Sequence, residues 1–532
     1  MANQKAVLLV SGWIFSLLIT PAIALKDSVG KDGVNALRLH QAPLNLLGRK
    51  IGIGQVEVGR PVKLGKDKAA NILGTINPKA VFYRDRASTA DQNVDEHASM
   101  VAQVMIARDK LLKGVAPKAN LYAAAIGSLH EGGQPHECLT SQHIAQQNNG
   151  DIRAINFSFG ESLARDERKE ARLDGKALLT SCIDWSARKH NVLYVVAGNQ
   201  GTGGIPIPTD HFNGVTTAYT IQRNQRFAKV DFANLSDFPV GIGRSLLKRE
   251  INHGSRRAVS LLAPGGQISL YNQKGEVKKV SGTSFAAPHI TGIVALLQEF
   301  GDRQLQQNSS RWTLDSRRHE VMKAVLLNSA DKIEDQGDGL LLNMEKTILG
   351  EKNHTWLESD AYTTPRIPFD IQMGTGQINA WRAYQQFQAG QPRKLQSVEE
   401  MGWNYDRVEA LSYQDYYLQS PLIAGSHVAI TLTWDRLVTL NDLNRNQQYD
   451  VGETFRDRGL NNLDLYLLPA DEEHNMRNTC ASLSAEDSTE HIFCPIPATG
   501  RYKIRVHYRH QFNNPVQGYG LAWWTKGENE ID

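Results

Sequence analysis

The sequence predicts an α/β fold built on a doubly wound, mostly parallel sheet, followed by a C-terminal antiparallel β-sandwich. Two observations support this prediction. Up to about residue 390, short runs rich in Val, Ile and Ala alternate with segments of helical periodicity, which is the order of parallel strands joined by crossover helices. Beyond that point, apolar and polar residues alternate strictly, as in strands that bury one face.

The composition is ordinary for a globular protein with room for two or more domains. The chain has 532 residues, of which 41% are hydrophobic and 22% charged, and its formal net charge is +3. Because no run of Lys or Arg stands out, we expect neither nucleic acid nor an anionic membrane as a partner.

Residues 1–24 have the three parts of a secretory signal peptide. Lys5 precedes an apolar run over residues 6–19, and Ala22-Ile23-Ala24 forms a small-residue cleavage site. The run is shorter than the roughly 20 residues of a membrane span. We therefore expect cleavage after Ala24, a secreted or periplasmic protein, and no stable membrane association afterwards. An uncleaved membrane anchor is the alternative.

Within the first domain, strands are expected at 49–56, 119–125, 152–159 and 192–196, and helices at 94–112 and 182–189. The run at 192–196 is continuously apolar, as in a strand buried on both faces. In such sheets ligands bind beyond the carboxyl ends of the strands, so the residues that carry chemistry are expected there.

A linker is predicted at 388–393, and the second domain follows it. Three alternating sets of apolar residues predict its strands: Val428, Ile430, Leu432 and Trp434; Leu463, Leu465 and Leu467; Tyr502, Ile504, Val506 and Tyr508. The predicted divisions are therefore a signal peptide at 1–24, an α/β domain at 25–392 and a β-sandwich at 393–532.

The four cysteines fit an exported protein. Cys138 and Cys182 fall in the first predicted domain, and Cys480 and Cys494 in the second. We expect one disulfide within each domain. Metal binding is disfavoured because no C-x-x-C spacing occurs; free buried thiols are the other alternative.

The most informative segment is 281–289, Ser-Gly-Thr-Ser-Phe-Ala-Ala-Pro-His. A Gly-Thr-Ser turn into a helix of small residues places Ser284 at a helix N-terminus, where its own N–H and the helix dipole favour developing negative charge. The segment resembles the nucleophile motif of subtilisin-like serine proteases, the subtilases. An ordinary helix start rich in Ser and Thr is the alternative.

Two more segments resemble subtilase motifs. Residues 96–102 resemble the helix that carries the general base, which implies that His97 takes the proton from Ser284. Residues 195–201 resemble the strand end that supplies the oxyanion-hole amide, which implies that role for Asn199. The alternatives are a surface or core histidine and a turn asparagine.

The resemblance also implies a substrate-binding strand. Residues 154–160 resemble the strand that pairs with extended substrate, so Ser158, Phe159 and Gly160 are expected to bind it. Residues 319–330 and 374–380 resemble the elements that close subtilase domains, so the resemblance covers about residues 45–390.

The third triad position departs from the family, which has a strand ending in Asp. Here Glu57 stands at that place, two residues before Gly59, and the order Glu57, His97, Ser284 is that of subtilisin. Glu can orient a catalytic histidine as Asp does. The rival carboxylates are Asp85, Asp91 and Asp95.

These features predict a secreted serine endopeptidase that acts on proteins or peptides through an acyl-enzyme. The helix after His97 departs from the family pattern at Ala98, Met100 and Gln103, which keeps a catalytically inactive binding or scaffold protein as the alternative. A hydrolase of esters is a third possibility, disfavoured by the substrate-pairing strand. Residues 25–50 are too few for the folded propeptide that resembling proteases carry.

A segment of the second domain predicts a structural Ca²⁺ site. Oxygen-bearing side chains stand at loop positions 1, 3, 5, 9 and 12 of an EF-hand-type pattern: Asp442, Asn444, Asn446, Asp450 and Glu453. Gln447 replaces the usual Gly at position 6. A solvated polar loop is the alternative. The flanking segments 462–466 and 499–504 resemble jelly-roll domains appended to some secreted subtilases.

Overall fold

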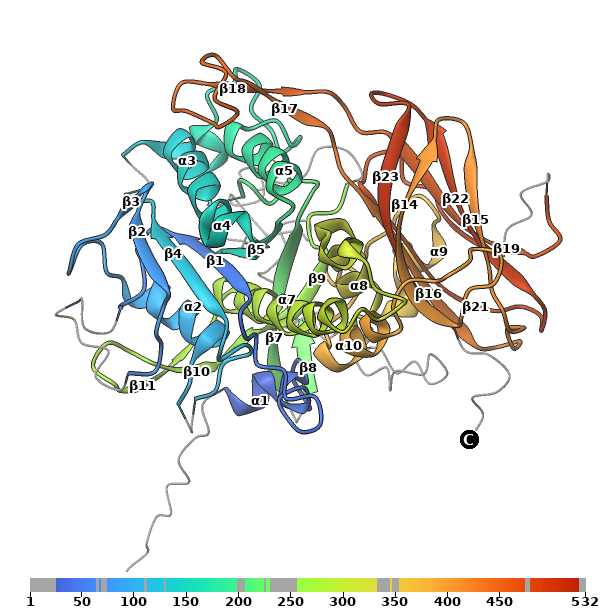
Figure 1. Ribbon diagram of the computed structural model, residues 1–532, viewed down its shortest axis with the longest axis horizontal. Coiled ribbons are helices and arrows are strands. Elements are labelled where there is room, and N and C mark those ends of the chain that lie inside the picture. The colour runs from blue at the N-terminus through green and yellow to red at the C-terminus, as the bar shows by residue number, and fades with distance from the viewer. Residues whose placement is uncertain are drawn as a thin grey trace, which may run out of the picture.

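The computed structural model describes residues 25–63, 67, 74–109, 112–128, 131–198, 206–223, 226–229, 256–332, 345–346, 354–473 and 479–525. An α/β part, blue to yellow in Figure 1, lies beside a β-sandwich drawn in orange and red. Both predicted parts of the fold are therefore present. The expected signal peptide lies outside the described residues.

The first part is built on a nine-stranded sheet in the order β3-β2-β4-β1-β5-β6-β7-β8, with β9 also paired to β7. Its central pairs are parallel, and only β3 and β8 pair antiparallel. The strands are β1 (Gly52–Glu57), β2 (Ala80–Tyr83), β3 (Arg86–Ala87), β4 (Asn120–Ala125), β5 (Ile152–Phe157), β6 (Leu193–Ala197), β7 (Val215–Arg223), β8 (Arg226–Lys229) and β9 (Leu261–Gly266).

Helices cover both faces of this sheet. The long helices are α2 (Glu96–Ile106), α3 (Gly133–Ala145), α5 (Leu178–His190), α7 (Thr283–Gln306), α8 (His319–Asn328) and α10 (Ala380–Gln388). Alternate residues of one strand enter different cores: Ile53 of β1 packs with α2 and α7, whereas Val56 packs with α3 and α5. Side chains of a strand alternate in this way, so the central strands are apolar on both faces.

Short elements complete the α/β part. They are the helices α1 (Lys26–Val29), α4 (Gln147–Gly150) and α9 (Asp360–Thr363), the strand pairs β10 (Ile268–Tyr271) with β11 (Val277–Val280) and β12 (Glu345–Lys346) with β13 (His354–Thr355), and 3-10 turns at Ala36–Arg38, Leu163–Arg165, Leu314–Arg317 and Trp356–Glu358.

Helix α2 is shorter than the predicted 94–112. The chain turns outward at Ala107, and Gly114 returns to pair with it through an N–H to carbonyl bond of 3.0 Å. A Cβ on Gly114 would lie 2.7 Å from the Ala107 nitrogen. The sequence keeps its helical periodicity beyond Ile106, but the helix ends there because the chain turns to make this contact between Ala107 and Gly114.

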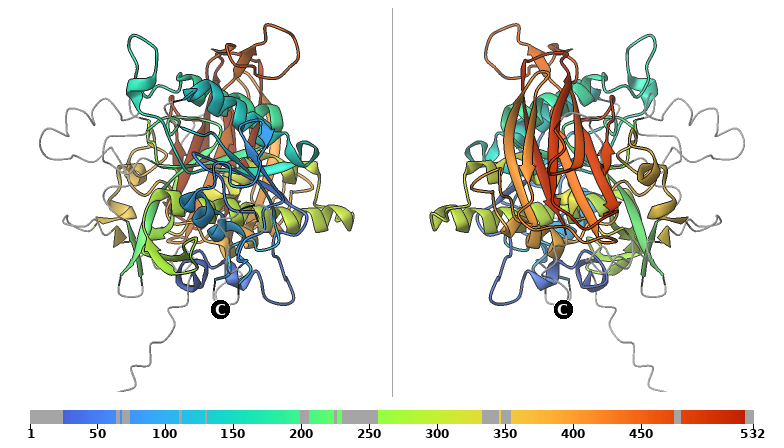
Figure 2. Two further views of the ribbon diagram at one scale, coloured as in Figure 1. Left: turned by 90° about the vertical axis from the view of Figure 1, so that its left-hand side faces the viewer. Right: turned by 90° about the vertical axis from the view of Figure 1, so that its right-hand side faces the viewer.

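The second part is a sandwich of two antiparallel four-stranded sheets, β14-β23-β16-β21 and β15-β22-β19-β20, whose strands face the viewer on the right of Figure 2. Its strands are β14 (Met401–Glu409), β15 (Tyr413–Tyr417), β16 (His427–Trp434), β19 (Asn462–Pro469), β20 (Cys480–Ser482), β21 (Thr489–Pro495), β22 (Tyr502–His510) and β23 (Val516–Trp524). The three predicted alternating sets lie in β16, β19 and β22 and fill the core between the sheets.

The two parts pack tightly through α8, which lies between the α/β sheet and the sandwich in Figure 1. A Cβ on Gly520 of β23 would lie 2.6 Å from the carbonyl of Glu320. The Thr433 hydroxyl donates to that same carbonyl at 2.7 Å. Backbone and side-chain atoms of the sandwich therefore contact helix α8 directly.

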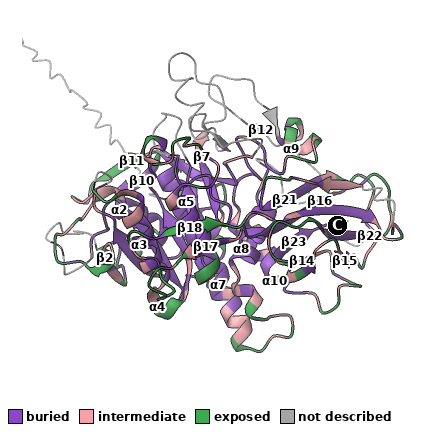
Figure 3. Ribbon diagram, turned by 90° about the horizontal axis from the view of Figure 1, so that it is seen from above, coloured by how far each residue is buried: buried purple, intermediate pink, exposed green. Residues whose placement is uncertain are grey.

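A hairpin of the second part reaches back over the first. Strands β17 (Val438–Asn441) and β18 (Thr454–Asp457) form a separate two-stranded sheet that lies above α3 and α5 in Figure 1. Val438 and Tyr449 of the hairpin segment share a buried cluster with the Cys138–Cys182 disulfide. Its tip is exposed, as the green ribbon in Figure 3 shows.

Both expected disulfides are present, Cys138–Cys182 joining α3 to α5 and Cys480–Cys494 joining β20 to β21. Among the described residues, no helix combines the length and the apolar character needed to cross a membrane.

Candidate active site

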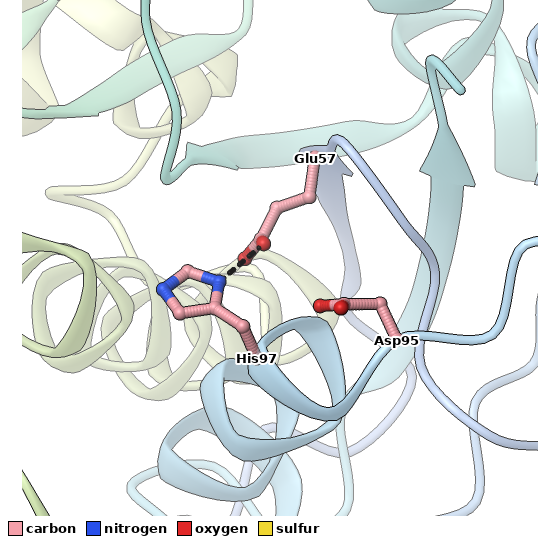
Figure 4. Close-up of side chains that lie close together, drawn as sticks. All are labelled: Glu57, Asp95 and His97. Carbon is pink, nitrogen blue, oxygen red and sulfur yellow. Dashed lines mark hydrogen bonds and ion pairs between the residues drawn. The ribbon is translucent and has the colours of Figure 1, made fainter. Parts of the chain in front are cut away.

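The end of β1 and the start of α2 bring Glu57 and His97 together. Asp95 begins the helix, since its side chain accepts the N–H of Ala98 at 2.8 Å, as N-cap residues do. His97 then stands in the first turn, facing the last residue of β1. Its Nδ1 lies 2.8 Å from Glu57 Oε2, and its other ring nitrogen points away from the carboxylate (Figure 4).

Gln55 supports this pair from the same face of β1, two residues before Glu57. Its amide donates to Glu57 Oε1 at 3.2 Å and to the Ala98 carbonyl at 2.9 Å. Both carboxylate oxygens are therefore bonded, and the strand is tied to the helix. Gln55 is not among the residues predicted from the sequence, although the period-two rule for strands places it on the same face as Glu57.

Burial and charge shift the pKa values of the pair. The Glu57 side chain is 3% exposed and that of His97 41%. The Glu57 carboxylate raises the pKa of His97 to about 9, against the opposing effect of burial. Burial raises the pKa of Glu57, while the neighbouring imidazole lowers it. We expect the imidazolium–carboxylate form to persist to alkaline pH, because the two charges stabilise each other.

Ser284 lies in the first turn of α7, and reciprocal hydrogen bonds with Ser158 connect it to the end of β5. Its hydroxyl donates to the Ser158 carbonyl at 3.3 Å, while the Ser158 hydroxyl donates to the Ser284 carbonyl at 3.1 Å. Asn156 donates to the Ser158 hydroxyl at 2.8 Å. The hydroxyl of Ser284 is thus directed to Ser158 in this structure, and not to His97.

The start of helix α7 nevertheless contacts the histidine. The ring of Phe285, the residue after Ser284, lies 5.4 Å from the His97 ring, centroid to centroid. Thr283, the residue before Ser284, donates from its hydroxyl to the Gly198 carbonyl at 2.7 Å. Helix α7 is therefore held between α2 and the end of β6.

The remaining predicted residues are those of the oxyanion hole and of the substrate-binding segment. Asn199, predicted for the oxyanion hole, lies outside the described residues, directly after Gly198. Ser158, Phe159 and Gly160 are buried just beyond β5, and the Phe159 ring stacks on Phe157. This segment can therefore offer a substrate chiefly its backbone.

The rival carboxylates are placed differently. Asp85 lies in the β2–β3 turn, 3.9 Å from Arg86, and the N–H of Asp91 donates to Asp67. Asp95 is near the pair in Figure 4, but its carboxylate caps α2. Its negative charge adds to the increase in the pKa of His97.

The predicted calcium-binding residues lie in the loop between β17 and β18. The Asp442 carboxylate accepts the N–H groups of Asn446 and Gln447 at 3.1 and 2.8 Å. Glu453 accepts those of Leu443 and Asp450 at 2.7 and 3.0 Å. The loop is therefore folded around its own carboxylates.

The side-chain amides of the loop also converge. Asn444 and Asn446 both donate to Asp450 Oδ2 at 2.7 Å. Gln447, at the position where such loops favour Gly, has a φ of 62°. The left-handed turn is therefore present although the residue that favours it is not.

Comparisons with known proteins agree with these motifs. A model of the subtilase family matches residues 66–345. Subtilisin Savinase of Lederbergia lenta is 26% identical over 47% of this chain and 78% of its own length. M-protease of Shouchella clausii is 26% identical over 41% of this chain. The match spans 48% of M-protease, about half of that protein.

Two solved structures are also similar. The maturation protease of prenylagaramide, PagA, shares 19% identity at a TM-score of 0.39, over 63% of this chain and 93% of its own. A cold-adapted subtilisin-like serine proteinase shares 19% identity at a TM-score of 0.35, over 56% of this chain and 87% of its own.

Proposed function

Because the chain belongs to the subtilase family, we propose that it is a secreted serine endopeptidase with Glu57, His97 and Ser284 as its triad. The single observation that best supports this is the 2.8 Å bond from His97 Nδ1 to Glu57. It fixes the ring so that Nε2 is the free nitrogen, as a general base requires.

The proposed reaction begins with a rotation of the Ser284 side chain from the Ser158 carbonyl toward His97. The hydroxyl oxygen attacks the peptide carbonyl as its proton passes to His97 Nε2. Glu57 stabilises the imidazolium that forms, and His97 then protonates the leaving amine. Water repeats the sequence on the acyl-enzyme and releases Ser284.

The oxyanion that forms in each step needs donors. The N–H of Ser284 at the start of α7 is suited to this, since the first N–H groups of a helix have no partner within it. We assign the second donor to the Asn199 amide on the motif that contains it. The backbone of Ser158, Phe159 and Gly160 would pair with extended substrate.

Reaction with a fluorophosphonate tests the proposal. We expect one labelled residue, Ser284, and the loss of labelling and of peptide cleavage in Ser284→Ala. Ser281→Ala, a change of an exposed serine three residues earlier, is the matched control and should leave both intact. Labelling at another residue would contradict the assignment of Ser284, and no labelling would favour the inactive scaffold protein, for which the Ser284–Ser158 bond is the supporting observation.

Export belongs to the same proposal, with domains at 25–392 and 393–532 after removal of residues 1–24. Leu25 is buried and immediately precedes helix α1. The mature chain should begin at Leu25 when its N-terminus is sequenced. A chain that keeps residues 1–24 would contradict export by cleavage.

We also propose that the 442–453 loop binds Ca²⁺. The donor set suits the ion, because all five side chains offer oxygen, three of them as carboxylates. Bound Ca²⁺ would neutralise the charge that Asp442, Asp450 and Glu453 concentrate in one short loop. It would thereby stabilise the hairpin on α3, where Gln142 exchanges two hydrogen bonds with the Tyr449 backbone at 2.6 and 3.1 Å.

A further inference from the structure

A pocket of about 650 Å³ lies beyond the end of β5. Its walls come from the start of α3, the segment after β5 and the start of α5, and from Thr454 and Phe455 of β18. Both parts of the molecule therefore shape it. Glu161, the residue after the Ser158–Gly160 segment, lines the pocket.

Behind Glu161, which lines the pocket, lies a second buried carboxyl group, that of Glu137. Glu137 of α3 and Glu161 are each 1% exposed. Arg165 donates to Glu161 Oε1 at 3.1 Å, and the carboxyl groups of Glu137 and Glu161 hydrogen-bond each other, but no other donor of the described residues bonds Glu161 Oε2 or the oxygens of Glu137. Buried polar atoms are normally paired, so these oxygens are suited to a donor from outside the chain.

The two carboxyl groups bond each other and have one neighbouring guanidinium, that of Arg165. Burial and the neighbouring Glu161 hold the pKa of Glu137 well above its ordinary value, while Arg165 acts in the opposite direction. The pair therefore favours keeping a proton, because both groups are buried and only one cation lies beside two acids. A cation that entered the pocket would allow Glu137 to ionise.

The other charges of the pocket do not supply that cation. Arg168 is bound to Asp166 and Asp174 at 2.5 and 2.8 Å. Lys176 and Glu167 are exposed at the pocket and carry opposite charges, so together they add no net positive charge.

The pocket is close to Ser284. Glu161 follows Ser158 by three residues, which span at most about 11 Å of chain, and the Ser158 carbonyl lies 3.3 Å from the Ser284 hydroxyl. The backbone of Glu161 is fixed by reciprocal bonds with Ile207 at 2.8 and 3.1 Å. Cys138, next to Glu137, is held by its disulfide to Cys182. Glu161 is thus rigidly placed and close along the chain to the residue that bonds Ser284.

We propose that this pocket selects peptides with Lys or Arg as the residue whose carbonyl Ser284 attacks. The inference rests on the proposed endopeptidase function. The ammonium or guanidinium group would donate to Glu161 Oε2, a charge-assisted pairing that a neutral side chain cannot replace, and its charge would favour the ionised form of Glu137 behind it.

Cleavage of a peptide library by the full mature chain is the first test. Products should end predominantly in Lys or Arg. Cleavage without a basic preference would overturn the inference and leave the endopeptidase function standing. Failure of both cleavage and fluorophosphonate labelling would instead overturn the proposed function itself.

Paired peptides that differ only in Lys or Leu at that residue give the second test. We expect Glu161→Gln to lower kcat/KM for the Lys peptide by roughly 30-fold and to change that for the Leu peptide by less than about 3-fold. Glu167→Gln removes a charge from the exposed rim and is the matched control, with little effect on either peptide. Equal losses on both peptides in Glu161→Gln would overturn the assignment.

Inhibition by benzamidine supplies a test that needs no altered substrate. It should compete with the Leu peptide in the wild-type chain and compete at least tenfold less well in Glu161→Gln. Undiminished inhibition of that variant would place the cation elsewhere and contradict the inference.

Discussion

The catalytic pair and the β17–β18 loop both depend on carboxylates, but different partners satisfy them. Glu57 is buried and bonded to two side chains, those of His97 and Gln55. Asp442 and Glu453 instead accept backbone N–H groups of their own loop. A buried carboxylate with one ionisable partner can change that partner's pKa, whereas a carboxylate held by backbone donors chiefly determines a conformation.

The largest effect that distinguishes the two regions should come from Glu57→Gln. The substitution preserves the shape but removes the charge that stabilises the imidazolium. By analogy with the loss of the acidic triad member in other serine proteases, kcat should fall by about 10⁴ with little change in KM. Steady-state kinetics measures this effect.

Two substitutions sharpen that result. Glu57→Asp should retain partial activity, between those of Glu57→Gln and the wild type, because the shorter side chain reaches less well from the same backbone. Asp95→Asn is the control for a nearby charge and should act more weakly than Glu57→Gln. If Asp95→Asn or Asp85→Asn were crippling while Glu57→Gln kept near-full kcat, that aspartate would be the orienting residue.

The pH dependence of activity tests the same pair. Because the pKa of His97 is raised to about 9, the free base is scarce at neutral pH and increases with pH. We expect kcat/KM to rise roughly 50-fold between pH 7 and pH 9. In Glu57→Gln the rise should move below pH 6.5, since burial alone lowers the pKa of an imidazole. A wild-type profile already flat above pH 7 would contradict the pairing.

The same shift affects stability with a defined sign. The pKa of His97 is higher in the folded chain than the ordinary 6.5, so the folded state binds the proton more tightly. This stabilisation is complete below about pH 6.5 and is lost as pH rises toward 9. Activity and this part of the stability should therefore change in opposite directions over that range.

Calcium should affect the loop and leave the catalytic pair unchanged. EDTA is expected to lower the Tm of the full mature chain by a few degrees relative to saturating Ca²⁺, because a ligand of the folded state stabilises it. Asp442→Ala with Glu453→Ala should remove that difference and leave the kcat of the calcium-free protein unaltered. A wild-type Tm indifferent to EDTA would favour the solvated loop.

The smallest effect concerns the turn at Gln447. A left-handed backbone costs an ordinary residue about 1 kcal/mol more than it costs Gly. Gln447→Gly should therefore be more stable than Gln447→Ala by about 0.5–1 kcal/mol in denaturant unfolding. If the two were reversed, the turn would not have the φ of 62° seen here.

The sequence by itself determined the fold class, the family and both disulfide pairs. Nearly continuous apolar strands require helices on both faces, and strict alternation requires a half-buried sheet. Both patterns can be recognised within short segments of the chain, so the fold class is predictable from sequence. Motifs such as that around Ser284 are contiguous, because a turn and a helix start must be adjacent in the chain. The Glu57 and His97 assignments came from two such motifs.

The tertiary structure decided what pairs across the chain. Only folding directs Ser284 to Ser158, turns the chain at Ala107 and sets Glu137 against Glu161. Only folding lays a hairpin of the sandwich over α3 and α5 and makes β18 part of a pocket beyond β5. These contacts join residues far apart in sequence whose types are individually common, so packing and the pairing of buried charge, and not any local pattern, select them.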